Sequence, residues 1–362
     1  MAKLRVGLLF GGRSVEHEVS IASASSIFKA LDPSLYEVLP ICVGQDGDWR
    51  IGRVGMLPEE AARPGGADVP ALSGHRAIEQ VGSRAGGGER RVDVIFPIIH
   101  GTGGEDGSLQ GFLEMAGVAY VGAGVLGSAL EMDKEVSKRL LAQAGIRVVP
   151  WVLVHARELG DPAAVLERAF HALAPPVFAK PACLGSSVGT HKVKAREELL
   201  PALRDAARYD EKLLVERAID GREIEVAVLG GEEPEASLPG EIRPKREFYD
   251  YESKYVDEDT ELLVPAPLSD EQTAALRRIA RAAFRALEGY GMARVDFFLE
   301  RGTGDLYVNE LNSLPGFTEV SMYPRLWEAS GLPYPALLDR LIELALQRHR
   351  RRGALETTYR RG

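Results

Sequence analysis

Four polar side chains share one face of a predicted β-hairpin: Arg294, Asp296, Glu310 and Asn312. The stretches MARVDFFLE and DLYVNELN have the composition of strands, in which side chains two residues apart share a face. The glycines of the intervening RGTGD predict a turn. If this turn is centred on its threonine, Asp296 lies opposite Glu310, and the neighbouring pair is Arg294 and Asn312. Opposed Cβ atoms are about 4.5–5.5 Å apart, so the two carboxylates repel each other unless positive charge lies between them.

Such a face suits a site for a metal ion and an anion. Asp296, Glu310 and Asn312 offer hard oxygen ligands, and Mg²⁺ typically binds through one or two carboxylates together with phosphate oxygens and water. Arg294 beside them suits a developing negative charge. The alternative is a salt-bridged hairpin surface.

The second strand of the hairpin is predicted to alternate without interruption and then to break. Alternation places Leu306 and Val308 on the same face as Glu310, and Tyr307 and Leu311 on the other. The Leu-Pro-Gly sequence that follows ends the strand in a loop.

Two lysines and a loop of small residues could bind phosphate. Lys134 lies in the first turn of a predicted helix, where a cation opposes the helix dipole. Lys180 ends the apolar run PPVFA, where a buried lysine needs an anion. The loop GSSVG (185–189) follows, and its small residues let backbone N–H groups approach phosphate oxygens. The alternatives are two surface lysines and a plain hairpin loop.

Three glutamates lie at the ends of predicted elements. Glu216 closes one strand and Glu223 opens the next, so the stretch between them could bind a base edge through its backbone and a ribose through a carboxylate. Solvated strand ends are the alternative. Glu16 begins a helix at the carboxyl end of a strand, where ligands of parallel α/β sheets bind, and could hold an ammonium group. Its alternative role is a first-turn partner of the helix dipole.

The elements that position these residues begin with a βαβ unit, which predicts a parallel sheet. The strand KLRVGLLFGG, a helix with apolar residues at helical spacing and the strand YEVLPICV follow one another, and VDVIFPII then ends at His100. Residues 44–91 are rich in Gly, Pro and charge and are predicted to be mostly loop. Further predicted strands are PPVFAKPA, THKVKA, KLLVERAID and REIEVAVLG, and further helices are MDKEVSKRLLAQAGI and SDEQTAALRRIARAAFRALEG, the last with a capping box from Ser269 to Gln272.

The 362 residues are predicted to form an α/β chain of three parts. The parts are residues 1–131, 132–221 and 222–350, followed by a basic tail over 351–362. The start of this tail is interpreted as a helix terminus whose cations suit the helix dipole, followed by a frayed end.

The whole-chain totals exclude several classes of protein. A net charge of −9 gives no general affinity for nucleic acid, and no apolar stretch approaches the roughly 18–20 residues of a membrane helix. The only two cysteines, Cys42 and Cys183, lack metal-ligand spacing and fit a reducing cytosol, which predicts a cytoplasmic protein. The N-terminal apolar run is too short for a typical signal peptide. The loop GTGGEDG misses the dinucleotide pattern G-x-G-x-x-G, and no G-x-x-x-x-G-K-[ST] phosphate loop occurs.

Taken together, eight stretches resemble the D-alanine–D-alanine ligases of the ATP-grasp superfamily. In chain order they are LLFGGRSVEHEVS, HGTGGEDGSLQG, SALEMDK, AKPACLGSSVG, LVERAIDGREIEVAVL, EFYDYESKY, ARVDFF and VNELNSLPGFTEVSMYP. The resemblance runs from residue 4 to about residue 345. It departs at Cys183, where a polar residue is expected, and residues 44–91 and the tail after Arg350 carry no match.

The resemblance implies an ATP-grasp fold with an N-terminal Rossmann-like domain, and a reaction in two steps. The carboxylate of one D-alanine attacks the γ-phosphate of ATP and gives an acyl phosphate. The amine of a second D-alanine then attacks that carbonyl, and phosphate leaves. The implied partners are ATP, D-alanine, two Mg²⁺ or Mn²⁺ ions and a second copy of the chain in a homodimer, with a role in peptidoglycan synthesis.

The resemblance also implies a role for each site residue. Glu16 and His100 would bind the first substrate, with Glu16 on its ammonium group and Ser186 and Tyr255 orienting Glu16. The remaining implied roles are phosphate binding by Lys134, Lys180, Lys254 and the Ser186-Ser187-Val188-Gly189 loop; adenine and ribose binding by Glu216, the Ala218–Ile219 backbone and Glu223; metal binding by Asp296, Glu310 and Asn312; oxyanion stabilisation by Arg294 and the Gly316 N–H; and binding of the second D-alanine by Ser321 and Met322.

The segment 247–261 is predicted to be a lid. It is long, polar and rich in tyrosine, whereas a disordered linker would be poor in aromatic residues. Closure would exclude water from the acyl phosphate, with Tyr255 reaching Glu16 and Ser186.

Two other functions stay open at this point. One is a related ATP-grasp ligase, such as a D-alanine–D-lactate ligase, although the YDYESKY pattern in this chain is absent from the similar lactate-type enzymes. The other is a nucleotide-binding regulatory protein that has lost catalysis. The intact set of polar residues argues against such decay, and D-alanine-dependent ADP release would separate the two.

Overall fold

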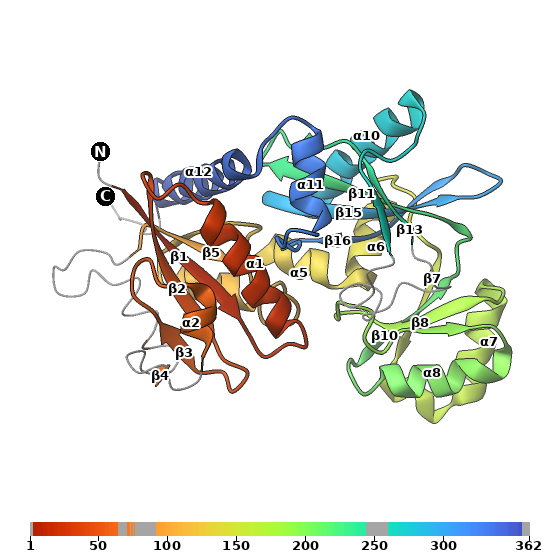
Figure 1. Ribbon diagram of the computed structural model, residues 1–362. Helices are drawn as coiled ribbons and strands as arrows, with labels where there is room; N and C mark the ends of the chain where they lie inside the picture. Colours follow the sequence, from red (N-terminus) through yellow and green to blue (C-terminus); the bar gives the residue numbers. More distant parts are fainter. Residues whose placement is uncertain are drawn as a thin grey trace, which may run out of the picture.

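A computed structural model of the chain describes residues 3–63, 71–72, 74, 76, 92–243 and 260–356. In these residues three sheets follow one another along the chain, which confirms the α/β class (Figure 1). The first sheet uses residues 4–120, the second 151–217 and the third 221–312. The part boundaries near residues 131 and 221 remain predictions, and they fall between successive sheets.

The N-terminal sheet has the strand order β4-β3-β2-β1-β5-β6. β1 pairs in parallel with β2 and β5, and β5 with β6, which confirms the predicted parallel core. β3 and β4 extend one edge as antiparallel strands. The strand bounds are β1 Leu4–Gly11, β2 Tyr36–Val43, β3 Trp49–Ile51, β4 Ala71–Leu72, β5 Val94–Pro97 and β6 Ala119–Tyr120.

Both faces of this sheet are covered, because alternate side chains of its strands enter two different cores. Leu8 and Phe10 of β1 pack with helices α1 and α12 on one face. Leu9 packs with α4 on the other face. The helices are α1 His17–Ala30, α2 Pro58–Ala62, α4 Ser108–Met115 and α12 Tyr334–Gly353.

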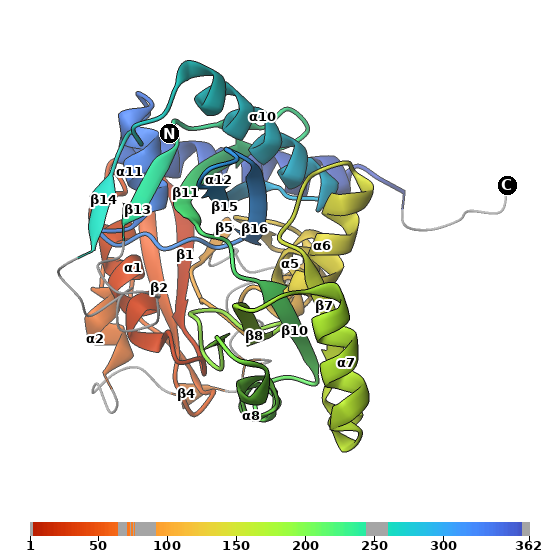
Figure 2. The same ribbon diagram turned by 90° about the vertical axis from the view of Figure 1, so that its right-hand side faces the viewer.

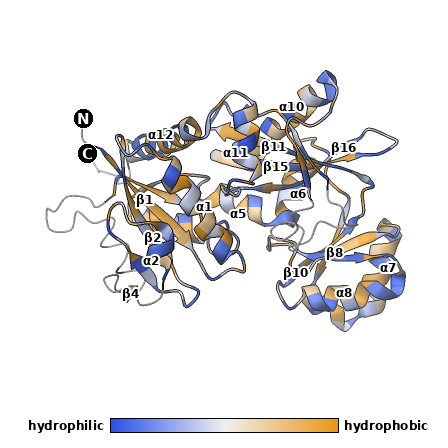
Figure 3. Cartoon of the chain, viewed as in Figure 1, coloured by the Kyte–Doolittle hydropathy of each residue, from blue (hydrophilic) through white to orange (hydrophobic). Residues whose placement is uncertain are grey.

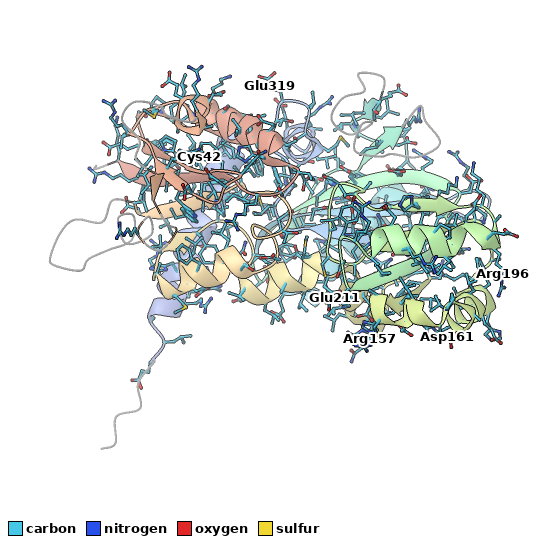
Figure 4. All side chains as sticks on the ribbon, turned by 90° about the horizontal axis from the view of Figure 1, so that it is seen from below. Cys42, Arg157, Asp161, Arg196, Glu211 and Glu319 are labelled. Carbon is cyan, nitrogen blue, oxygen red and sulfur yellow. The ribbon has the colours of Figure 1, made fainter. Side chains whose placement is uncertain are left out.

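The central part is a four-stranded antiparallel sheet of order β7-β10-β8-β9 with its own core (Figure 2). Figure 4 shows Arg157, Asp161 and Arg196 on its outer side, far from Cys42 in the N-terminal part. The elements are β7 Trp151–His155, α7 Pro162–Ala172, β8 Val177–Pro181, β9 His191–Val193, α8 Leu199–Ala206 and β10 Lys212–Arg217, with two short 3₁₀ helices at Ala156–Gly160 and Arg196–Glu198.

The C-terminal sheet is antiparallel with the order β14-β13-β11-β15-β16, and β12 pairs with β11. Helix α10 packs against one face, whereas α11 and α12 pack against the other. The strands are mostly hydrophobic, and the helices that cover them have polar outer faces (Figure 3). The elements are β11 Gly221–Gly230, β12 Glu235–Ala236, β13 Gly240–Arg243, β14 Glu261–Leu263, α10 Asp270–Ala286, β15 Gly291–Glu300, β16 Leu306–Asn312 and α11 Met322–Ala329.

Two helices connect the N-terminal and central sheets, α5 Val125–Met132 and α6 Lys134–Gln143. Asp133 caps α6, since its side chain accepts hydrogen bonds from the backbone of Glu135 and Val136. The predicted helix ending near Gly145 is therefore confirmed, as is the capping box that begins α10 at Ser269. The cap places Lys134 at the first position of α6.

Two predictions concern segments between or after the sheets. The prediction that residues 44–91 are mostly loop applies to a segment whose described portion contains the short elements β3, β4 and α2, with loop and turn between them. The basic tail begins inside α12, which continues to Gly353 with Arg350, Arg351 and Arg352 in its last turn, as the helix-terminus interpretation requires. Of the predicted lid 247–261, only Thr260 and Glu261 are described, and Glu261 begins β14.

Candidate active site

The predicted register of the β15–β16 hairpin is confirmed at the polar face. Asp296 lies opposite Glu310, and Arg294 lies opposite Asn312. Closer to the turn the register shifts by one residue, and Phe297 then pairs with Val308.

This bulge corrects the prediction for Leu306 and Val308. Both pack with the apolar core under α10, on the face opposite to Glu310. A bulge leaves one extra residue on its strand, here Asn309, and so reverses the alternation beyond it. The polar face is therefore shorter than strict alternation predicts, and it is confined to the end of the hairpin that leads into Leu314.

A row of three carboxylates crosses this face, because β11 pairs with β15 on its other side. Glu225 of β11 lies opposite Asp296, which lies opposite Glu310. Arg294 binds two of them. Its Nε and Nη2 donate to the two carboxylate oxygens of Asp296 at 2.7 Å each, and its Nε lies 3.2 Å from Glu225 Oε2.

The charge of Arg294 is held by these neighbours. Burial lowers the pKa of the guanidinium, but attraction to Asp296 and Glu225 outweighs burial and raises the pKa well above its ordinary value. Asn312 Nδ2 also donates to Asp296 Oδ2, at 3.0 Å. Positive charge thus lies beside Asp296 and Glu225, and it offsets the repulsion within the carboxylate row.

Lys134 joins α6 to this face. Its Nζ lies 3.3 Å from Glu310 Oε2 and donates to the carbonyl of Leu184 at 2.9 Å. Burial lowers the pKa of Lys134, but the attraction of Glu310 outweighs it and the net shift is upward. The interpretation of Lys134 as a surface lysine is therefore wrong.

A second buried charge cluster lies on the central sheet. Glu216 accepts from Lys180 Nζ at 2.7 Å through Oε2, and its Oε1 lies 3.0 Å from Lys138 Nζ. Burial raises the pKa of Glu216, but the two lysines outweigh it and lower the pKa. Because Glu216 is buried, the interpretation of a solvated strand end is wrong for this residue.

The loop between β8 and β9 brings the central part to the N-terminal part. Ser186 and Ser187 have φ angles of 54° and 58°, in the left-handed region that non-glycine residues rarely occupy. In this conformation Ser186 Oγ donates to Glu16 Oε1 at 2.5 Å. The predicted contact between Ser186 and Glu16 is present, and Cys183 at the loop start is held through its N–H, which donates to Asp210 Oδ2 at 2.7 Å.

Glu16 lies in a buried acidic corner at the end of β1. A Cβ at Gly101 would lie 3.0 Å from Glu16 Oε2, so the glycine loop approaches this carboxylate closely. In the same loop Glu105 accepts from the N–H of Gly101 at 2.6 Å. Burial and the nearby charge of Glu16 raise the pKa of Glu105 to about 8. A ligand ammonium group would offset the negative charge of this corner.

His100 connects the same corner to the loop after β16. Its Nδ1 lies 3.0 Å from the carbonyl oxygen of Leu314, and its Nε2 lies 3.4 Å from Ser23 Oγ. Burial lowers the pKa of the imidazole. Both ring nitrogens therefore face protein groups, and a substrate contact by His100 remains a prediction.

The residues after β16 form a tight turn before α11. A Cβ at Gly316 would lie 2.7 Å from Ser321 Oγ, so only glycine fits there without movement of Ser321. Ser321 Oγ accepts from the Thr318 N–H at 2.9 Å. The Met322 side chain is buried and packs toward Gly240, so any contact of Met322 with a ligand would come from its backbone at the start of α11.

The predicted nucleotide-binding backbone lies between β10 and β11. The N–H of Ala218 donates to the Pro176 carbonyl at 3.1 Å, so a base contact by Ala218 would use its carbonyl. Ile219 follows in the same connection, and Glu223 lies on β11 opposite Phe298. Lys254 and Tyr255, and with them the lid prediction, lie outside the described residues.

Three residues of the site were missed from the sequence. Lys138 follows Lys134 by four positions on α6, which is the signal that both lie on one helix face. Glu225 shares its strand face with Glu223, two residues away. Glu105 lies in the GTGGEDG loop, which belongs to one of the eight stretches that carry the family resemblance, and its acidic residues are the signal that could have pointed to it.

The hairpin face fits a hard divalent cation by its chemistry. Asp296, Glu310 and Asn312 present oxygen atoms from paired strands, and cationic groups already balance the carboxylates. No cluster of three or more His, Cys, Asp or Glu side chains suited to a metal occurs in the part of the chain that the structure describes. Two carboxylates plus phosphate oxygens and water are enough for Mg²⁺, so this absence does not conflict with the fit.

No helix among the described residues combines the length and apolarity that crossing a membrane requires.

Comparison with known proteins identifies the family. The family model described as D-ala D-ala ligase N-terminus matches residues 5–123, and that described as D-ala D-ala ligase C-terminus matches residues 140–343. A D-alanine–D-alanine ligase of Thermoanaerobacter sp. is 48% identical over 354 residues, covering 96% of this chain and 98% of its own. A D-alanine–D-alanine ligase A of Bradyrhizobium diazoefficiens is 48% identical over 368 residues, covering 99% of each chain.

Solved structures agree. The D-alanine–D-alanine ligase from Coxiella burnetii superposes with a TM-score of 0.80 at 38% identity, covering 97% of each chain. The VanG D-Ala:D-Ser ligase from Enterococcus faecalis superposes with a TM-score of 0.83 at 32% identity, covering 95% of this chain and all of that one. The fold is therefore the ATP-grasp fold that the eight sequence stretches implied, and the chain is an enzyme that belongs to the D-alanine–D-alanine ligase family.

Proposed function

We propose that the protein joins two D-alanine molecules to D-alanyl-D-alanine and converts ATP to ADP and phosphate in the same reaction, supplying the dipeptide for peptidoglycan. The observation that carries this proposal is the hairpin face. There Arg294 lies beside Asp296 and opposite Asn312, and Lys134 reaches Glu310 from α6. Cations and oxygen ligands on one face suit a reaction in which phosphate is transferred and an oxyanion then forms.

In the first step a carboxylate oxygen of one D-alanine attacks the γ-phosphorus of ATP, and ADP leaves. Glu16, held by Ser186, would bind the ammonium group of this D-alanine. Lys134, Lys180 and the backbone of the Ser186–Gly189 loop would hold phosphate oxygens. The left-handed serines support the loop's role, because strained backbone is found where function requires it.

Nucleotide binding is proposed at the connection between β10 and β11. The Ala218 carbonyl and the Ile219 backbone would bind adenine, and Glu223 would bind the ribose. Glu216 would support them by fixing Lys180 at the phosphates, since the two groups are 2.7 Å apart.

In the second step the amine of another D-alanine attacks the acyl carbonyl, and phosphate leaves. Arg294 and the N–H of Gly316 would stabilise the oxyanion. Ser321 and the backbone of Met322 at the start of α11 would bind the incoming carboxylate, because the start of a helix attracts anions.

Asp296, Glu310 and Asn312 would bind two Mg²⁺ or Mn²⁺ ions. Such ions neutralise charge on the β- and γ-phosphates during transfer. Asp296 and Glu310 lie opposite each other on paired strands. Their carboxylates would therefore hold the phosphates at a fixed position relative to Glu16 and Arg294.

The second substrate is the part of this proposal most in need of a test. The VanG neighbour is named a D-Ala:D-Ser ligase, and D-lactate is the hydroxyl counterpart of D-alanine. Purified protein is incubated with ATP, Mg²⁺ and D-alanine, alone or with D-serine or D-lactate, and the products are identified by mass spectrometry. We expect D-alanyl-D-alanine to dominate in every mixture; a dominant mixed product would assign a different second substrate.

A cytoplasmic homodimer is proposed as the working form. The two cysteines remain as free thiols, and burial raises the pKa of Cys42 to about 11, which suits a reducing compartment. Light scattering that gives the mass of one chain at working concentration would overturn the dimer.

A further inference from the structure

The row of three carboxylates contains one member to which the proposed reaction assigns no role. Asp296 and Glu310 are proposed metal ligands, whereas Glu225 on the neighbouring strand is buried and lies opposite Asp296. Its contact is with Arg294, whose Nε lies 3.2 Å from Glu225 Oε2.

The sheet geometry explains how Arg294 reaches this carboxylate. Ala227 is the residue of β11 directly opposite Arg294, and its small side chain lets the guanidinium lie along the strand toward Glu225. Beyond Ala227 the same sheet face continues as apolar core with Leu229 and Met292. The polar partners of the guanidinium on this sheet therefore lie on the side of the carboxylate row.

Arg294 contacts two carboxylates, of which Asp296 is a proposed metal ligand and Glu225 is not. Asp296 holds it with two hydrogen bonds of 2.7 Å, but a divalent cation at Asp296 would compete for the same oxygens. Glu225 lies one strand further from Glu310, and its side chain is 7% exposed, against 20% for Arg294. A buried carboxylate on a central strand is a fixed partner, so it can hold the guanidinium while Asp296 binds metal.

We propose that Glu225 is a positioning residue, which keeps Arg294 aimed at the acyl carbonyl once Asp296 has turned to the metal. Arg294 without this anchor would be repelled by the bound divalent cations and lose its alignment with the oxyanion. This inference rests on the proposed role of Arg294, and the experiment separates the two.

The test measures the affinity of a phosphinate dipeptide analogue, whose tetrahedral anion resembles the oxyanion intermediate, by calorimetry with MgADP present. In Glu225→Gln we expect phosphinate affinity and kcat to fall about tenfold, the lower end of the range for loss of an outer-shell partner. MgADP affinity and KM for ATP should stay within about twofold. Glu225→Asp should recover part of the loss.

A double-mutant cycle shows whether Glu225 acts through Arg294. In an Arg294→Lys background, Glu225→Gln should add less than about a twofold loss. An equal loss in both backgrounds, or an equal loss of MgADP and phosphinate affinity, would overturn positioning and indicate a direct effect of the Glu225 charge. If Glu225→Gln keeps its phosphinate affinity while Arg294→Lys loses it, the role of Glu225 is overturned and the proposed role of Arg294 stands. If Arg294→Lys also keeps its phosphinate affinity, both roles are overturned.

Glu241→Gln is the matched control for stability. Glu241 is also buried on this sheet and pairs with two arginines: Arg222 donates to it through two hydrogen bonds of 2.8 Å, and Arg243 through one of 3.0 Å. It lies away from Arg294, so its loss should lower the melting temperature without lowering phosphinate affinity. If Glu225→Gln likewise lowers the melting temperature and leaves phosphinate affinity unchanged, Glu225 only stabilises the fold through its ion pair.

Discussion

Most buried charges of this protein are balanced by a partner from a different element. Glu216 has Lys138 and Lys180, Glu310 has Lys134, and Arg294 has two carboxylates. The sequence allowed the residue types and their strand faces to be predicted, because alternation is local. It could not identify the partners, because Glu216 and Lys138 meet only after the central sheet has folded against α6.

Glu131 is a buried carboxyl with no cation within salt-bridge distance among the described residues. It is buried on α5 near Gly289, and among the described residues neither of its carboxyl oxygens has a hydrogen-bond partner. Burial raises the pKa of Glu131 well above its ordinary value, with a smaller contribution from Glu105. Because the folded-state pKa is the higher one, the folded protein binds this proton more tightly than the unfolded chain does, so stability falls as the pH rises from the unfolded-state pKa toward the folded-state value.

Glu131→Met should therefore stabilise the protein, and more so at pH 8 than at pH 5. We expect a melting temperature about 3 °C above that of the unsubstituted protein at pH 8, since an unpaired buried polar group costs roughly 2–3 kcal/mol. Differential scanning fluorimetry at both pH values measures the difference. The exposed Glu328→Met serves as control. A difference that is constant or shrinks with rising pH would contradict the burial of an unpaired carboxyl.

At the scale of elements, the strands that were predicted best are those buried on both faces. β1 and β2 are continuous apolar runs between glycine or polar residues, and their bounds agree with the predicted stretches. β16 was predicted in place but not in detail, because nothing in its composition marks the bulge at Asn309. The serine loop was predicted by its small residues, whereas serine does not itself mark a positive φ, so the left-handed conformations of Ser186 and Ser187 could not be predicted from composition.

The left-handed conformation of Ser187 predicts an asymmetric response to substitution. Ser187→Val should raise KM for ATP about tenfold, because a β-branched residue in this region costs on the order of 1–2 kcal/mol and shifts the loop. KM for D-alanine should change less than about twofold. Steady-state kinetics with varied ATP measures the effect.

Two controls separate strain from loss of the hydroxyl group. Ser187→Gly removes the hydroxyl but tolerates a positive φ, and Thr190→Val places valine where the φ angle is not positive. Both should keep KM for ATP near its original value. An equal rise in Ser187→Gly would assign the effect to the hydroxyl group instead.

At the scale of the whole molecule, one apolar core joins the N-terminal and C-terminal sheets through α11 and α12. Arg348 of α12 adds a polar connection: its Nη1 donates to the Gly122 carbonyl at 2.6 Å and its Nη2 to the Tyr120 carbonyl at 2.9 Å. The guanidinium also lies 4.3 Å from the ring centroid of Tyr120 and 4.9 Å from that of Tyr290. The central sheet has a separate core, so the Ser186–Glu16 contact connects two parts that do not share one.

Arg348→Met should lower the melting temperature by about 4 °C. The substitution leaves two buried carbonyls without their donor, a loss of about 3 kcal/mol, and removes two cation–π contacts. Arg350→Met, two residues along the same helix but exposed, should change it by less than about 1 °C. Equal melting temperatures for the two variants would show that Arg348 does not connect the sheets.

The central claim is that a D-alanine carboxylate is activated by phosphoryl transfer, and isotope transfer tests it most directly. D-Alanine labelled with ¹⁸O in both carboxylate positions is incubated with the enzyme, unlabelled ATP and Mg²⁺, and the inorganic phosphate is analysed by mass spectrometry. Attack of the carboxylate on the γ-phosphorus forms an O–P bond, and attack of the amine then breaks the C–O bond. Each phosphate released with a dipeptide should therefore carry one ¹⁸O. Phosphate without label, or label in AMP, would contradict the acyl phosphate and the function proposed for this site.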